Sequence, residues 1–233
     1  MASRHGRQYG YSVSILLFAL LISFSCFAEI QSQSALTTDM VFQNAIKSGD
    51  LEDVNLLIQN GIDVNQPFSD GITPLHAAVI NNRENIMTVL IQAGAKVNAT
   101  DSTTKATPLH LAALYGREKM ATFLIEKGAD VDATMKFGIT PLLVATQFNQ
   151  AQIVQLLLEK KANIEQVDQE GFTALHFAAQ NGDTVVAKLL IEKGANINAQ
   201  EKAHRSTPFA IAVENNHPEV AHLLKENGAT DNL

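Results

Sequence analysis

The chain has 233 residues, of which 46% are hydrophobic and 18% charged; this suffices for one domain with a continuous core and excludes an intrinsically disordered chain. Its formal net charge is −7, and no cluster of Lys and Arg reverses this locally, so nucleic acid and anionic membrane surfaces are excluded as expected partners. Because it has no Trp and only 6% aromatic residues, the core is predicted to consist mainly of Ala, Leu, Ile and Val.

The first 28 residues have the pattern of a secretory signal peptide. Arg4 and Arg7 give a positive start, residues 13–26 form an apolar run, and the segment ends in Cys26-Phe27-Ala28, with small residues at the first and third places. The run is shorter than the ~20 apolar residues that a membrane-spanning helix needs, so cleavage after Ala28 is preferred, and an uncleaved anchor is the alternative. The pattern predicts export to the periplasm or the medium without a stable membrane anchor.

The expected mature chain begins with a linker over residues 29–38. Removal of residues 1–28 takes away two of the 17 Lys and Arg and none of the 24 Asp and Glu, so the mature chain is more acidic still. It also takes away Cys26, the one cysteine, which excludes disulfides, cysteine nucleophiles and thiolate metal sites.

From residue 39 onward the sequence repeats itself. A Thr-Pro-Leu-His segment or a close variant recurs at spacings of 34, 33, 33 and 34 residues. In each unit the Thr is suited to cap a short helix and the Pro to its first position, and a second, amphipathic helix ends near a Gly such as Gly94. No unit can bury both of its faces alone, so neighbouring units are predicted to stack around one core. The segments begin at Thr73, Thr107, Thr140, Thr173 and Thr207.

The Thr73-Pro74-Leu75-His76 turn, the Ala112-Ala113 pair and the tail over residues 128–132 resemble the ankyrin repeat. The resemblance covers residues 39–233. It implies an all-α solenoid of about six helix-turn-helix repeats with β-hairpin fingers. The expected repeats are an N-terminal cap at 39–70, four repeats at 71–104, 105–137, 138–170 and 171–204, and a C-terminal cap at 205–233.

Three residues depart from the repeat pattern. Lys161 stands where a helix-ending Gly is expected, and a left-handed backbone there would cost about 1–2 kcal/mol. Lys105 and Arg205 stand where other fingers have Gly, in the two units with 34-residue spacing. We therefore expect a soft point in the fourth repeat and two longer, differently bent fingers.

The seven histidines are the first candidates for catalysis or metal binding. The resemblance implies that His76, His110 and His176 bond to the Thr of their own turn and to nearby backbone. His217 and His222 are five residues apart, which does not place them on one helix face as ligands. No nucleophile-elbow, phosphate-loop, EF-hand or His-Glu-x-x-His motif occurs. We expect no enzyme activity, no cofactor and no metal.

Function is therefore expected on the concave face, where finger tips and first helices carry side chains that stacking does not need. Apolar and aromatic residues in the second to fourth repeats predict a site for another protein, although some of these side chains could instead extend the core. The chain is expected to be monomeric by itself; self-association through the patch or the stack ends is the alternative. The candidate binding residues are Phe68, Ile80, Leu114, Tyr115, Met135, Phe137 and Phe148.

Overall fold

The computed structural model describes residues 38–230, so the expected signal peptide and all but the last residue of the expected linker lie outside the described part. The chain divides into two compact units, Met1–Asn44 and Ala45–Leu233. Helix covers residues 38–48, so in the first unit its described residues, 38–44, are helical. The candidate functional residues all belong to the second unit.

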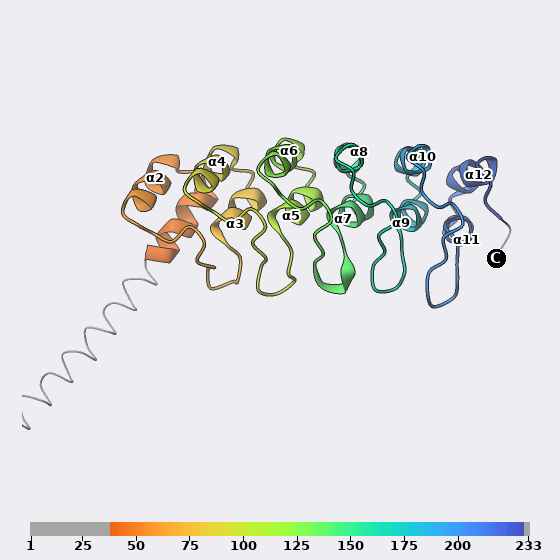
Figure 1. Ribbon diagram of the computed structural model, residues 1–233, viewed down its shortest axis with the longest axis horizontal. Coiled ribbons are helices and arrows are strands. Elements are labelled where there is room, and N and C mark those ends of the chain that lie inside the picture. Colours follow the sequence, from red (N-terminus) through yellow and green to blue (C-terminus); the bar gives the residue numbers. More distant parts are fainter. Residues whose placement is uncertain (1–37, 231–233) are drawn as a thin grey trace, which may run out of the picture. The chain divides into compact units, whose positions relative to one another are not determined.

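The second unit is a stack of helix pairs. Figure 1 shows the first helices of the pairs in one row, the second helices in a row beside them, and long loops on the side away from the second helices. From α3 to α12 each helix packs on its pair partner, and the first helices also pack on one another from repeat to repeat. The predicted all-helical ankyrin-type stack is confirmed. The helices are α2 (Leu51–Gln59), α3 (Pro74–Ile80), α4 (Glu84–Gln92), α5 (Pro108–Leu114), α6 (Glu118–Glu126), α7 (Pro141–Gln147), α8 (Ala151–Glu159), α9 (Ala174–Asn181), α10 (Thr184–Glu192), α11 (Pro208–Glu214) and α12 (Pro218–Glu226).

The first helix of each pair begins at the repeated threonine. Thr73, Thr140 and Thr207 each accept the backbone N–H three residues on, and a proline follows at the first helical position. The helices are short and rich in Ala and Leu, and nearly every residue of their first two turns is buried. Small side chains let neighbouring first helices approach closely, which makes these helices the centre of the core.

The second helices bury only one stripe. In α4 the buried residues are Ile86, Met87 and Leu90, and the rest of the helix is partly or fully exposed. These helices end in a residue with left-handed backbone, such as Gly94 at φ 93°. Lys161 takes this conformation after α8, with φ 66°, so the expected strain at this position is present.

The expected β-hairpin fingers are not confirmed. Among residues 38–230 no strand is assigned, and each finger is a loop closed by a backbone hydrogen bond, such as Phe68 N–H to Ile72 O at 2.9 Å. Neighbouring fingers are also joined by backbone bonds, for example Ser102 N–H to Gly71 O at 3.0 Å and Lys202 N–H to Glu170 O at 2.9 Å. The fingers therefore form a ladder with too few bonds to count as a sheet.

The two fingers without glycine are one residue longer, as expected. Asp101 N–H bonds to Ala106 O, a span of five residues, whereas the bond from Phe68 to Ile72 spans four. Lys105 and Arg205 nevertheless adopt the left-handed backbone of the glycines they replace, with φ 63° and 59°. The extra residue therefore changes the length of the loop and leaves the turn at its end in place.

Candidate protein-binding surface

The residue just after each first helix differs in kind between repeats. In the second and sixth repeats it is an asparagine that bonds to its own helix end: Asn81 Nδ2 donates to Ala77 O at 2.8 Å and Asn215 Nδ2 to Ile211 O at 2.9 Å. In the third and fourth repeats the same position holds Tyr115 and Phe148. Phe148 has no polar group that can make this bond, and the Tyr115 hydroxyl is at the far end of its ring, so these two repeats lack a local stabilising contact.

Both aromatic rings remain largely in solvent. Tyr115 is 44% exposed and Phe148 is 50% exposed. They follow α5 and α7, which pack directly against each other, so the two ring-bearing helix ends are neighbours. Two adjacent exposed aromatic residues in an otherwise polar series are typical of the centre of a protein interface.

The finger before α7 adds a third exposed ring. Phe137 is 66% exposed and has a left-handed backbone, with φ 65°. Its carbonyl accepts Gln169 N–H at 2.7 Å, and the preceding Lys136 N–H donates to Thr104 O at 2.8 Å, so both neighbouring fingers hold it in place. A bulky residue in this conformation is uncommon, and its ring has no part in the core.

Phe68 is a correction to the expected patch. Its side chain is only 6% exposed, because it lies at the base of its finger, five residues before Thr73, where it fills the core. Ile80, Leu114 and Met135 are half-buried. Of the seven predicted residues, the rings of Tyr115, Phe137 and Phe148 are exposed, three side chains are half-buried, and Phe68 is buried.

The turn histidines act between repeats, in agreement with the role that the resemblance implied. His76 Nδ1 lies 2.7 Å from Thr73 Oγ1 in its own turn, and its Nε2 lies 2.9 Å from Ala106 O of the next repeat. His110 and His176 make the same pair of contacts, with Ile139 O and Ser206 O as their partners in the next repeat. Because Nε2 faces a carbonyl, it carries the proton. Nδ1 accepts the N–H of the turn threonine, at 3.3 Å in the case of Thr73 and His76, so it carries none and the ring is neutral.

Burial sets the charge of these rings. It lowers the pKa of His76 and His176 below the ordinary value and lowers the pKa of His110 to about 4. A neutral imidazole with both nitrogens engaged and no accessible surface has no free atom for catalysis. The histidines are therefore part of the stack.

Two carboxylates that sequence reasoning did not single out organise the long fingers. Asp101 accepts the N–H groups of Thr103, Thr104 and Ala106, at 2.7, 2.6 and 2.8 Å. Burial alone would raise the pKa of Asp101, but these bonds together with that from the Thr104 hydroxyl hold it below its ordinary value. The signal was present in the sequence, since an acidic residue stands six positions before the repeated Thr in each 34-residue unit.

Glu201 has the same structural role in the last finger. It accepts the N–H groups of Ala203, His204 and Ser206 at 2.6, 2.7 and 3.0 Å, and its pKa is lowered by these bonds, that of Ser206 foremost. In both long fingers the carboxylate accepts three backbone N–H groups inside the loop. Both groups are fully occupied by backbone donors, so they are structural.

Within residues 38–230, no three His, Cys, Asp or Glu side chains are grouped so that they could hold a metal ion. No helix in this described part is long and apolar enough to cross a membrane.

The chain is similar to several known proteins over parts of its length. It is 40% identical over 62 residues to the palmitoyltransferase Hip14 of Drosophila melanogaster, covering 27% of this chain and 10% of that protein. It is 48% identical over 46 residues to protein fem-1 homolog C of Homo sapiens, covering 20% and 8%. It is 31% identical over 74 residues to the human Notch-regulated ankyrin repeat-containing protein, covering 30% and 65%. The chain thus spans only a tenth or less of the first two relatives.

The family comparison covers most of the sequence. A model of three ankyrin repeats matches residues 14–101, 42–135 and 142–233. These matches coincide with the stacked helix pairs, the threonine caps and the turn histidines described above. The chain belongs to the ankyrin-repeat family.

Proposed function

We propose that this protein is a non-enzymatic binding module that holds a protein partner on a concave face made by finger tips and first helices. Ankyrin repeats are a protein-interaction fold, and repeat stacks bind through extended surfaces of this kind. The centre of the proposed site is formed by Tyr115, Phe148 and Phe137. The half-buried Ile80, Leu114 and Met135 form its margin.

One observation carries the proposal: two adjacent repeats replace a helix-capping residue by an exposed aromatic ring. In the second and sixth repeats Asn81 and Asn215 bond to the helix end, which stabilises the fold. Tyr115 and Phe148 make no such contribution and expose apolar surface to water. Residues that cost stability and lie together on the surface are best explained by a partner that covers them.

Enzyme activity is not part of the proposal. Some relatives are palmitoyltransferases by name, but the chain aligns with only 10% of the length of one of them and 6% of another. In this chain the buried histidines and the two finger carboxylates are engaged by backbone partners. The described surface therefore offers apolar contact area, which suits recognition.

Export belongs to the proposal through the N-terminal sequence pattern. Removal of residues 1–28 would place Glu29 at the start of the mature protein and direct it to the periplasm or the medium. Intact-mass measurement of the protein from the producing cell should give a chain that begins at or near Glu29. A membrane-bound species that begins at Met1 would contradict cleavage.

The binding surface is tested with the double variant Tyr115→Asn with Phe148→Asn. Asparagine restores the residue found at Asn81 and Asn215, so this variant should fold at least as well as the unchanged protein, with a gain of about 1 kcal/mol from two restored hydrogen bonds. Partner binding should weaken by at least ~2 kcal/mol, or roughly 30-fold. The readout is quantitative capture of proteins from the native periplasm or medium.

The matched control is Val185→Asn, which changes another exposed apolar residue, 69% exposed on the second helix α10. A partner of the proposed face is retained by the unchanged protein and by this control and is lost from the aromatic variant. Equal capture by all three proteins would contradict the proposed site. Asn181 does not serve as a control, because it bonds to the preceding repeat.

A further inference from the structure

The last repeat ends in a face that is core in every earlier repeat. Val213 is 45% exposed, whereas the residues at its position in the four preceding repeats are all fully buried. In those repeats the next helix pair covers the position. The buried residues at the position equivalent to Val213 are Val79, Ala113, Thr146 and Ala179.

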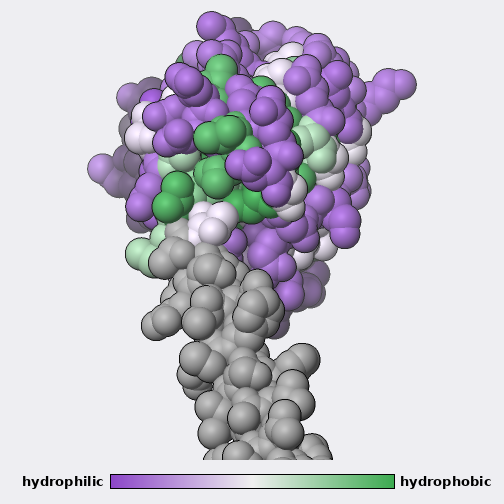
Figure 2. Space-filling view, turned by 90° about the vertical axis from the view of Figure 1, so that its left-hand side faces the viewer, coloured by the Kyte–Doolittle hydropathy of each residue, from purple (hydrophilic) through white to green (hydrophobic). Residues whose placement is uncertain are grey.

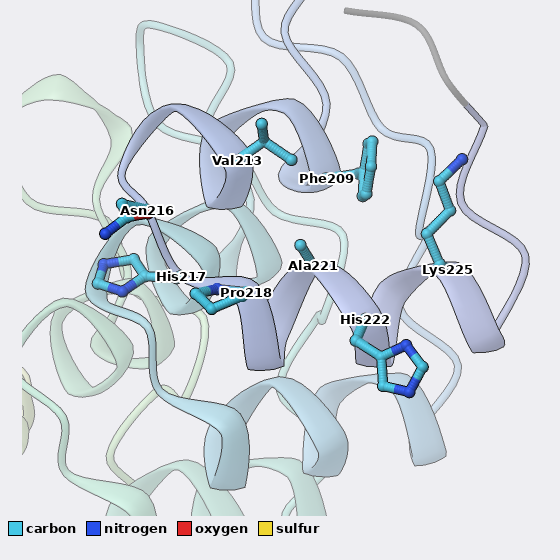
Figure 3. A pocket seen from close by; sticks show the side chains of 8 residues that line it. All are labelled: Phe209, Val213, Asn216, His217, Pro218, Ala221, His222 and Lys225. Atoms are coloured by element: carbon cyan, nitrogen blue, oxygen red, sulfur yellow. The ribbon is translucent and has the colours of Figure 1, made fainter.

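This face is hollowed between α11 and α12. Figure 3 shows Val213 and Phe209 on α11 above Ala221 on α12, with Lys225 at one end of the groove. The groove has a volume of about 310 Å³. Lys225 Nζ lies 4.5 Å from the centre of the Phe209 ring and partly covers it, and the positions equivalent to Lys225 in other repeats are Ile or Leu.

The opposite end of the unit also exposes a residue that is otherwise covered. Leu56 on α2 is 54% exposed, and its counterparts in the other second helices are half-buried. Figure 2 looks onto this end and shows apolar side chains gathered within a polar rim. Asp53 stands on α2 where the other second helices have a buried Ile, Met or Val.

Inside the unit, the turn after each first helix lies at the interface with the next repeat. The left-handed residue after the first helix is Gly49, Gly116 and Gly182 in odd repeats, and a side chain of the next repeat lies directly over it. His217, for example, covers Gly182 and contacts Gln180 O through Nε2 at 3.1 Å. Arg83 and Gln150 cover Gly49 and Gly116 in the same way.

In even repeats the turn residue is an asparagine with the same left-handed backbone: Asn82, Asn149 and Asn216. In the next repeat, the residue directly after the equivalent turn is the one that pairs with it in register. This residue is Arg117 for the turn at Asn82 and Asp183 for the turn at Asn149. Asn216 belongs to the last repeat. The residue at the corresponding position of the first repeat is Asp50, the same type as Asp183.

We propose that a second copy of this chain stacks head to tail on the last repeat, with its α2 end seated in the groove between α11 and α12. The alternation of glycine and asparagine turns then continues unbroken, because Gly49 of the added copy follows Asn216. Asp50 of the added copy then follows Asn216 in the same register in which Asp183 follows Asn149. The interface repeats, between copies, the interface that already joins one repeat to the next.

The charges of the two faces agree with this pairing. Lys225 is the cation among the residues that line the groove, and no carboxylate is among them. The two lining histidines have partners already, His217 with Gln180 O at 3.1 Å and His222 with Glu226 at 3.3 Å. The start of α2 carries Asp50, Glu52 and Asp53. Opposite charges favour a head-to-tail contact and disfavour contact between two identical ends. Such a contact does not close on itself, so association continues beyond the dimer as concentration rises.

Sedimentation velocity over a concentration series tests the proposal with two single variants, Val213→Glu and Leu56→Glu. The unchanged chain should associate increasingly with concentration, and each variant alone should stay monomeric. An equimolar mixture of the two variants should form 1:1 dimers and stop there, because one intact pair of ends remains. Val185→Glu, on α10 away from both ends, should associate like the unchanged chain.

Thermal unfolding checks that both variants remain folded, which is expected because both positions are exposed. A Leu56→Glu variant that still dimerises would indicate contact between two C-terminal faces and would overturn the proposal. A constant monomer mass for the unchanged chain, or association that survives in both single variants, would overturn it as well. The outcome does not depend on the proposed binding surface, whose residues are unchanged in every variant.

Discussion

At the scale of single residues, the turn histidines connect repeat stability to pH. His110 is neutral, buried and bonded to its own turn and to the next repeat. Because its pKa is about 4 in the folded protein and about 6.5 in an unfolded chain, only the unfolded state takes up a proton between these values. The free energy of unfolding is therefore unaffected by this residue above pH 6.5 and falls as the pH is lowered toward 4.

We expect His110→Gln to reduce stability by roughly 1 kcal/mol at pH 7.5, the scale of a net hydrogen bond. The unchanged protein should lose stability between pH 6.5 and 4.5 with a contribution from His110 of up to about 1.4 kcal/mol per pH unit. The variant lacks this contribution, so the free energies of unfolding of the two proteins should become equal at about pH 6, and below that pH the variant should be the more stable of the two. A difference that stays constant from pH 7.5 to 4.5 would contradict the neutral, buried histidine.

Single residues also show what the sequence could and could not reveal. Phe68 and Phe137 are both finger phenylalanines, but Phe68 is buried at the finger base and Phe137 is exposed near its tip. Counting from the repeated Thr separates them, because Phe68 stands five residues before Thr73 and Phe137 three residues before Thr140. Phe68 donates the bond that closes its finger, as the buried Asp101 and Glu201 do in theirs. The left-handed backbone of Phe137 has no signal in the sequence, since the glycine that normally takes this conformation follows it at Gly138.

At the scale of elements, the fourth repeat differs from the others at both of its joints. It has Leu143 in place of the turn histidine, so the histidine bond to the next repeat is missing. Asn181 of the fifth repeat compensates by donating from Nδ2 to Thr146 O, Gln147 O and Asn149 Oδ1 at 3.1, 3.0 and 2.8 Å. The sequence pattern gives no signal for this role of Asn181, because a contact between repeats cannot be read from one repeat alone.

The end of α8 is the second joint, and here the sequence prediction can be tested. Lys161 has φ 66°, and the equivalent Gly61, Gly94, Gly128, Gly194 and Gly228 have φ between 85° and 98°. Lys161→Gly should raise the free energy of unfolding by ~1 kcal/mol, because it relieves a side chain in the left-handed region. The denaturant midpoint of the variant measures the gain.

The reciprocal change, Gly194→Lys, is the matched control for this joint. Space around Gly194 is open, so the added side chain meets no neighbour and only the backbone conformation is altered. It should lower stability by a similar amount. A Lys161→Gly variant with an unchanged midpoint, beside a destabilised Gly194→Lys variant, would show that Lys161 has a compensating contact.

At the scale of the whole molecule, the repeat period predicted the fold well. The period of 33 or 34 residues, the Thr caps and the Gly stops set the helix pairs and their order, and these are local signals that each repeat carries in full. The expected hairpin fingers were not confirmed in the described residues, because finger pairing depends on a few bonds between repeats. The exposed rings of the candidate surface were predicted as a group, and burial within the group required the three-dimensional stack.

The most direct test of the account measures stability and partner affinity together in the variant with Tyr115→Asn and Phe148→Asn. Once a captured partner has been purified, calorimetry gives its Kd, and urea unfolding gives the stability of the same sample. The account predicts opposite changes: stability unchanged or higher by about 1 kcal/mol, and affinity lower by roughly 30-fold. Unchanged affinity would contradict it, and so would a loss of affinity that accompanies a loss of stability, because the rings would then belong to the core.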